Sequence, residues 1–213
     1  LMTLINDILD LSKIESGKLT LQYEPVDITR VFLETKQFFK PEADKKNIEI
    51  KTQISSQLPK YLLIDEVRLS QILINLLGNA IKFTHKGYIK ISVYGNYASD
   101  KNSIMHLAET NADKKLEKNQ SGSRYDLIFE IEDTGIGISE NQLKLIFDPF
   151  KQQQGQDFKQ FGGTGLGLAI TKNIVKLMDG NITVSSKADK GTRFRIIIPD
   201  LEISTITFCK EQN

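Results

Sequence analysis

The sequence has a single cysteine, no long apolar run and almost no excess charge. Cys209 has no partner for an internal disulfide, which suits a reducing compartment such as the cytosol. The 28 basic and 27 acidic residues leave a net charge of +1, so the charge does not indicate a nucleic-acid partner or a membrane surface. No segment of about 18 apolar residues and no signal peptide is present. We therefore expect a cytoplasmic domain without a nucleic-acid partner, whose full-length parent can still be membrane-anchored.

The composition is ordinary for a folded globular protein. Of the 213 residues, 39% are hydrophobic and 26% are charged, enough for one large domain with an appendage. No internal repeat is visible. The sequence begins with Leu1 rather than methionine, inside an apolar pattern typical of a helix. We expect it to be a piece of a longer polypeptide.

The first residues carry a helical stripe. Leu1, Leu4, Ile8 and Leu11 are spaced alternately by three and four, which predicts a helix up to about residue 16. Gly17 is its expected stop. The width of the stripe favours a helix of a bundle, and the alternative is a helix that packs on its own domain.

Helices and strands alternate along the rest of the chain. Helical spacing and capping residues predict helices at about 28–46, 65–83, 139–146 and 165–178. Alternating apolar residues, or β-branched and aromatic ones, predict strands at about 19–23, 48–52, 87–94, 125–133, 182–186 and 192–198. Asp27 and Asp65 are expected helix caps, Pro41 is expected to kink or interrupt its helix, and Pro199 is expected to end the last strand.

Residues 95–124 interrupt this alternation. They are rich in Asn, Ser, Asp and Lys, and they are too polar and too long for an ordinary connection. We expect a surface insertion between neighbouring strands, with a helical turn near Met105 to Ala108. A solvated loop is the simpler interpretation, and a regulatory contact is the alternative.

Four short stretches, at 75–84, 133–138, 147–151 and 162–168, carry most of the functional information. They read NLLGNAIKFT, DTGIGI, FDPFK and GGTGLGL. Each alone is weak evidence, because glycine-rich hexamers arise by chance. Four different patterns in order within about 95 residues are difficult to produce accidentally. Together they predict one nucleotide site.

The chemistry of these residues fits Mg-ATP. Asn75 and Asn79 lie four apart on one helix face, with Lys82 within the next turn. Neutral amide oxygens suit a magnesium ion that already contacts phosphates. Asp133 can accept a hydrogen bond from the exocyclic amine of adenine, whereas the guanine oxygen would face its carboxylate. Gly135 and Gly137 would let the backbone approach the purine, between apolar walls formed by Phe83 and Ile138.

The glycine-rich stretch at 162–168 is not a dinucleotide fingerprint. No strand ends just before it, and no acidic residue follows at the required distance. Its position at the start of a helix still offers backbone N–H groups to a phosphate. We expect residues 148–163 to form a lid over the nucleotide.

The four stretches resemble the N, G1, F and G2 boxes of sensor histidine kinases, whose catalytic domain shares its fold with gyrase and mismatch-repair ATPases. The resemblance implies that Asn79 holds Mg²⁺ with help from Asn75, that Lys82 and Lys151 contact phosphates, and that Thr192 lies near the adenine. The implied ATP-binding set is Asn75, Asn79, Lys82, Phe83, Asp133, Gly135, Gly137, Ile138, Lys151, Gly163, Thr164, Gly165, Leu166, Gly167, Leu168 and Thr192.

The resemblance also implies an architecture. The fold class is α/β (α+β), a two-layer sandwich of a mixed sheet with helices on one face, known as the Bergerat-type ATP-binding fold, preceded by a bundle helix. Residues 1–17 would end the second dimerisation helix of a homodimer, and 18–199 would form the catalytic ATP-binding domain with its insertion at 95–124. Residues 200–213 would be a tail or linker. The wording around Asp10 and Phe147 resembles hybrid kinases with a fused receiver domain.

The residue at position 75 separates two reaction classes. Gyrase-type relatives have there a Glu that activates water, and an asparagine cannot act as a general base. The resemblance therefore implies transfer of the γ-phosphate to a histidine upstream of Leu1, and then to an Asp of a response-regulator receiver domain. His85 and His106 lie outside the acceptor motif and are expected at the surface. The alternatives are an ATPase or serine kinase of the same fold, or a non-catalytic nucleotide-binding signalling domain.

Overall fold

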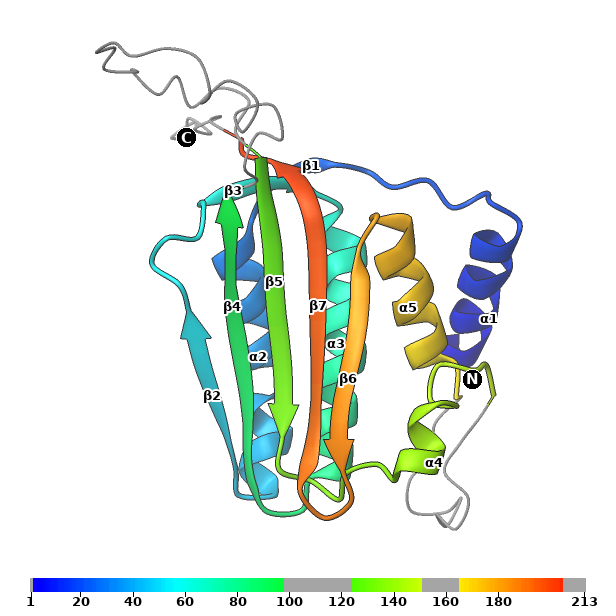
Figure 1. Ribbon diagram of the computed structural model, residues 1–213, viewed down its shortest axis with the longest axis vertical. Coiled ribbons are helices and arrows are strands. Elements are labelled where there is room, and N and C mark those ends of the chain that lie inside the picture. Colours follow the sequence, from blue (N-terminus) through cyan, green and yellow to red (C-terminus); the bar gives the residue numbers. More distant parts are fainter. Residues whose placement is uncertain (1, 98–123, 151–164, 205–213) are drawn as a thin grey trace, which may run out of the picture.

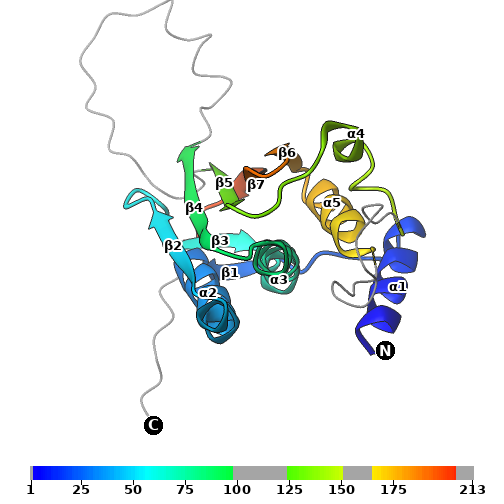
Figure 2. The same cartoon turned by 90° about the horizontal axis from the view of Figure 1, so that it is seen from below.

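A five-stranded mixed sheet forms one layer of the molecule, and helices cover one of its faces (Figures 1 and 2). The computed structural model describes residues 2–97, 124–150 and 165–204. The strands follow the order β2-β4-β5-β7-β6, with β2 and β4 parallel and the other neighbours antiparallel. Their bounds are β2 Ile48–Ile54, β4 Gly87–Tyr97, β5 Arg124–Asp133, β6 Asn181–Lys187 and β7 Gly191–Glu202.

Three helices, α2 (Ile28–Lys45), α3 (Glu66–Phe83) and α5 (Gly167–Leu177), lie against the same face of this sheet (Figure 2). Helix α1 (Met2–Glu15) lies beside α5, and the short α4 (Glu140–Leu143) lies near β6. A second, two-stranded sheet pairs β1 (Glu24–Asp27) with β3 (Tyr61–Ile64). This arrangement confirms the expected two-layer α/β fold.

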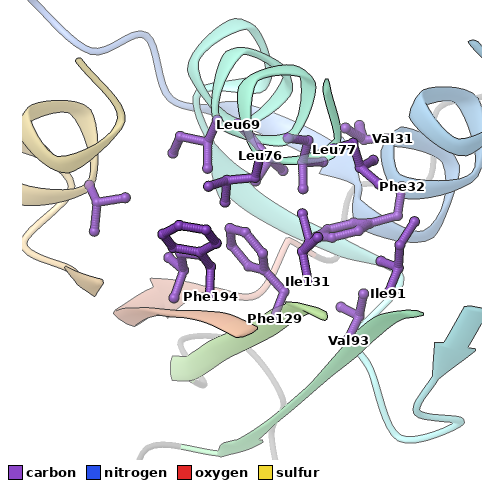
Figure 3. Close-up of a cluster of buried hydrophobic side chains, with 14 of the residues drawn as sticks. Val31, Phe32, Leu69, Leu76, Leu77, Ile91, Val93, Phe129, Ile131 and Phe194 are labelled. Carbon is purple, nitrogen blue, oxygen red and sulfur yellow. The ribbon is translucent and has the colours of Figure 1, made fainter. Parts of the chain in front are cut away.

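The core fills the space between the sheet and the helices (Figure 3). Side chains that alternate along the strands point toward α2 and α3, and the intervening positions face outward. Phe32 of α2 and Phe129 of β5 meet edge to face with ring centroids 5.3 Å apart. The labelled core residues are Val31, Phe32, Leu69, Leu76, Leu77, Ile91, Val93, Phe129, Ile131 and Phe194.

Helix α3 positions the first motif, and its start is fixed by Asp65. The Asp65 side chain accepts hydrogen bonds from the backbone N–H of Arg68 at 3.0 Å and from that of Gln22 at 2.9 Å. This is the expected N-cap. The core-facing residues of α3 follow the helical period and are Leu69, Ile72, Leu73, Leu76, Leu77, Ala80 and Ile81. The asparagines of the motif therefore point away from the core.

Helix α1 stops where the sequence predicts. Gly17 has a left-handed φ of 65°, and the N–H of Lys18 bonds to the carbonyl of Lys13 at 2.9 Å. Asp10 of α1 accepts hydrogen bonds from Arg68 at 3.1 Å and from Gln71 at 2.9 Å. Among the side chains of this helix that the structure describes, Ile5, Ile8 and Leu9 are apolar and exposed.

The expected end of a strand at Pro199 and the expected interruption of a helix at Pro41 are both wrong, whereas a kink at Pro41 stays a prediction. Helix α2 runs through Pro41 to Lys45, because buried Phe39 and Ala43 on either side hold it against the core. Strand β7 continues past Pro199 to Glu202. Its register with β5 shifts between Tyr125 and Leu127, so the proline lies at an irregularity where no ladder N–H is needed.

Other boundaries also differ. The strand expected at 19–23 lies instead at Glu24–Asp27, where it pairs with β3, a strand that the sequence analysis did not predict. Helix α4 ends at Leu143 rather than Ile146, and its N-cap Ser139 makes no side-chain cap bond. The predicted turn near residues 105–108, like His106 and Cys209, lies outside the described residues. No helix in the described part of the chain is long and apolar enough to cross a membrane.

Candidate nucleotide site

The end of strand β5 carries a buried carboxylate. Asp133 is 8% exposed, and its Oδ1 accepts a hydrogen bond from the N–H of Gly135 at 2.8 Å. Burial raises the pKa of Asp133 to about 6, although the backbone N–H groups of Gly135 and Thr192 oppose the rise. Thr192 lies directly opposite Asp133 on β7 and is also buried. The register of β5 with β7 therefore places Thr192 beside Asp133.

Ser186, which was not predicted from the sequence, completes this end of the site. Its hydroxyl donates to the carbonyl of Gly191 at 2.8 Å and accepts from the N–H of Ile138 at 2.8 Å. Because a serine hydroxyl has one proton, the 2.9 Å contact with Thr192 makes the threonine hydroxyl the donor. The signal in the sequence was the hairpin between 182–186 and 192–198, whose pairing sets Ser186 against Thr192.

The glycines of the second motif pack against protein backbone. A Cβ at Gly135 would lie 2.4 Å from the carbonyl oxygen of Phe83, and one at Gly137 would lie 2.0 Å from that of Lys187. Gly137 also has a φ of 68°, which disfavours other residues. The N–H of Ile136 donates to the Phe83 carbonyl at 3.2 Å. These contacts fasten the loop after β5 to the end of α3 and to the end of β6.

The two asparagines of α3 lie side by side. The Nδ2 of Asn79 donates to the Oδ1 of Asn75 at 3.4 Å, and the Nδ2 of Asn75 donates to the hydroxyl of Thr171 at 2.7 Å. Thr171 is on α5 and is 1% exposed. It was not predicted, although its place one turn after Gly167 on the same helix was a usable signal.

Helix α5 approaches Asn75 closely at Gly167. A Cβ there would lie 2.2 Å from the Asn75 Oδ1, so a side chain would displace the amide. The first and fourth motifs, about 90 residues apart, are therefore in direct contact. Lys82 continues the face of Asn75 and Asn79, and its Nζ lies 4.7 Å from the centre of the Phe83 ring. Burial lowers the pKa of the Lys82 ammonium.

The start of α5 is joined to the third motif through backbone. Gly165 has a φ of 70°, and its carbonyl accepts a hydrogen bond from the N–H of Phe150 at 3.1 Å. The N-cap residue Leu166 makes no cap bond with its own side chain. Leu166 is buried in the core and Leu168 packs against it, so a contact by Leu166 would come from its backbone. Lys151, Gly163 and Thr164, with most of the expected lid, lie outside the described residues.

The residues present are compatible with a magnesium ion bound through phosphate. Asn75 and Asn79 offer amide oxygens on one helix face, and Mg²⁺ takes few protein ligands when phosphates supply the others. Within the described ranges there is no group of three or more His, Cys, Asp or Glu side chains that could hold a metal by themselves. Asn79 and Asn75 therefore remain the predicted metal ligands.

The fold and the four joined motifs define a nucleotide-binding domain of the ATPase type. Residues 64–202 match the family model described as histidine kinase-, DNA gyrase B-, and HSP90-like ATPase. The chain belongs to this family, which confirms the resemblance seen in its motifs.

The similar proteins include many histidine kinases. Hybrid signal transduction histidine kinase L of Dictyostelium discoideum is 37% identical over 199 residues, which cover 93% of this chain and 10% of that protein. Histidine kinase 5 of Arabidopsis thaliana is 37% identical over 204 residues, covering 93% and 21%. The chain therefore spans about a tenth to a fifth of these relatives.

Solved structures give the same result. Full-length ShkA in complex with AMPPNP has a TM-score of 0.70 and 28% identity, covering 96% of this chain and 36% of that one. The histidine kinase AdeS of Acinetobacter baumannii has a TM-score of 0.63 and 28% identity, covering 92% and 76%. The chain thus has the fold of histidine kinase catalytic domains.

Proposed function

We propose that this chain is the ATP-binding catalytic domain of a sensor histidine kinase. It transfers the γ-phosphate of Mg-ATP to a histidine outside this sequence. The proposal rests mainly on the presence of an asparagine at position 75 and on the contacts of its amide. Its amide lies beside Asn79 and bonds to Thr171, at the position where hydrolytic relatives hold a base. An amide cannot take a proton from water, so phosphate is kept for another acceptor.

At the adenine end, the Asp133 carboxylate accepts a hydrogen bond from the exocyclic amine of the base and disfavours guanine. Thr192 and the Ser186 hydroxyl hold the strand opposite this carboxylate. Phe83 and Ile138 provide apolar contacts. The glycines at 135 and 137 let the loop after β5 pack closely enough to form this end of the site.

At the phosphate end, Asn79 and Asn75 would hold Mg²⁺, which neutralises the triphosphate and orients its oxygens. Lys82 and Lys151 supply positive charge. The backbone N–H groups of the glycine-rich stretch, with Gly163, Thr164, Gly165, Leu166, Gly167 and Leu168, would bind phosphate at the start of α5. With these roles, the transferable phosphate would lie between α3 and α5. The two helices are joined there by the hydrogen bond from Asn75 to Thr171.

The proposed partners are a dimerisation and phosphoacceptor segment, a response-regulator receiver domain and a second copy of the full-length protein. The exposed Ile5, Ile8 and Leu9 of α1 support a helix–helix contact of this kind. Several of the similar proteins are named hybrid histidine kinases or sensor kinases, which supports a relay to a receiver. We infer a cytoplasmic position, where ATP and response regulators meet, for a parent protein that is either soluble or membrane-anchored.

The test uses labelled ATP and the chain with and without a separate dimerisation domain that carries the acceptor histidine. The chain alone should show little hydrolysis and no acid-labile phosphoprotein. Adding the second domain should give acid-labile phosphohistidine at a rate that rises with its concentration, because tethering is lost. Stable phosphoserine, or rapid phosphate release abolished by substitution of Asn75, would instead assign the chain to the hydrolase or serine kinase class.

A further inference from the structure

A lysine outside all four motifs contacts the helix that carries the first one. Lys46 follows α2 and caps it through its own backbone N–H. Its side chain is half-buried, and Nζ donates to the carbonyl oxygens of Ile81 at 2.7 Å and Lys82 at 3.3 Å. One ammonium therefore bonds two successive carbonyls at the end of α3.

These bonds complete the C-terminus of α3. The last four carbonyls of a helix have no partner within it and carry its negative dipole end. Here Ala80 bonds to the N–H of Thr84 at 3.0 Å, and Phe83 bonds to the N–H of Ile136 at 3.2 Å. Lys46 supplies the partners for the two carbonyls between them. Without Lys46, these two carbonyls would lose a charged donor. The free-energy cost of this loss is well above the cost of losing a donor from a carbonyl that water can reach.

The end of α3 is also part of the candidate nucleotide site. Lys82 and Phe83 are its last residues, and the carbonyl of Phe83 holds the loop that follows Asp133. A shift of the peptide groups at Ile81 and Lys82 would move the Phe83 ring and this loop together. The Lys46 ammonium is thus linked to the adenine end through the backbone groups at the end of α3.

We propose that Lys46 is a positioning residue for nucleotide binding, acting through the C-terminus of α3 and resting on the proposed function of the site. It does not touch the nucleotide. Its role predicts a loss that is already present for AMP, because the Phe83 ring and the loop after Asp133 belong to the end of the site that binds the base. A lysine that acted by attracting phosphate would give a loss that grows with each added phosphate.

The experiment measures the affinity of the 213-residue chain for ATP, ADP and AMP by calorimetry in the presence of magnesium. Lys46→Met should weaken the binding of all three, AMP included, by about fivefold to tenfold, as expected for the net contribution of one ordinary hydrogen bond. Lys46→Arg should restore binding to within about twofold, because it keeps the charged donor. Lys45→Met, at an exposed position at the end of α2, is the matched control and should bind as the wild type does.

A second measurement reports the mechanism directly. The amide of Ile136 should exchange its hydrogen faster in Lys46→Met, because its bond to Phe83 loosens, and Lys46→Arg should restore its protection. If Lys46→Met does not fold, Lys46→Gln, which keeps a neutral donor, takes its place in the same comparison.

Wild-type affinity in Lys46→Met, a loss that is absent for AMP, or failure of Lys46→Arg to rescue would overturn the role of Lys46. Absence of ATP binding by the wild type would instead overturn the proposed function. The two failures are therefore distinguishable.

Discussion

The adenine end and the phosphate end of the site are held in different ways. At the adenine end, Asp133, Thr192 and Ser186 are fixed by strand register and by bonds of 2.8 to 2.9 Å. At the phosphate end, side chains of α3 and α5 meet through one bond of 2.7 Å and one of 3.4 Å. The proposed base selectivity would therefore be built into the sheet before nucleotide binds, whereas the proposed metal and phosphate ligands would change partners on binding.

The sharpest test of the phosphate end is Asn79→Ala. Alanine is a good helix former, so α3 should stay folded while the proposed metal ligand is lost. We expect the magnesium-dependent part of ATP affinity to fall by at least about 100-fold, since even indirect contacts to a metal are worth about 10- to 100-fold. Titration of ATP with and without magnesium measures it. Full metal dependence in the variant would remove Asn79 from the metal site.

The adenine end predicts an effect on stability. The pKa of Asp133 is raised to about 6 from 3.8, so the folded protein binds a proton more tightly than the unfolded chain. The free energy of unfolding should therefore fall as pH rises from about 4 to 6, by about 3 kcal/mol, and stay low above that. Asp133→Asn should lack this loss and be the more stable protein at pH 7. Denaturant unfolding at several pH values, without nucleotide, compares the two.

The same substitution should weaken nucleotide binding. Asp133→Asn can still offer an oxygen to the adenine amine but loses the charge, and we expect a loss of about 1.5 to 3 kcal/mol in ATP affinity. Preference over GTP should also shrink. Calorimetry with both nucleotides tests this pair of effects. Unchanged ATP affinity would show that this carboxylate does not contact the base.

A milder change tests the same carboxylate without mutation. Since the pKa of Asp133 is about 6, lowering the pH from 7 to 5 should neutralise most of it. ATP affinity should fall by about tenfold for the wild type. The Asp133→Asn chain is the control for the titration of ATP itself and should show only the nucleotide's own change. Identical pH profiles would contradict the role of Asp133.

The smallest predicted effect is a change in stability at a position of α3 that faces the core rather than the site. Gly78 lies between the two asparagines, but a Cβ there would meet only the Phe39 ring, at 3.6 Å. Gly78→Ala should therefore stabilise the protein by about 0.5 to 1 kcal/mol and leave ATP affinity unchanged. Thermal unfolding and calorimetry check both parts. A fall in affinity would mean that the asparagine face extends to this position.

Local patterns of the sequence predicted the elements that carry the site. Asp65 and the apolar period were sufficient for α3, and the spacing of Asn75 and Asn79 placed them on one face. The order of the motifs also led to the correct family.

Partners contributed by distant segments could not be found in this way. Ser186 and Thr171 act through strand pairing and helix packing, and Lys46 acts across about 35 residues. The β1–β3 pair and the continuation of β7 past Pro199 depend on register with other strands. The steric demands at Gly135 and Gly137 come from backbone that packs there only in the folded chain.

Helix α3 is held by hydrogen bonds to other segments at both of its ends. Its 18 residues span about 27 Å, and its first turns are tied to α1 through Asp10 and to the preceding segment through the Gln22 amide. Its far end is tied to Lys46 and Ile136. A hydrogen-bonded helix of this length transmits displacement by sliding or turning as one body. A displacement of α1 would therefore move Asn75 and Asn79 directly, because no flexible segment lies between α1 and α3 at the Asp10 contact.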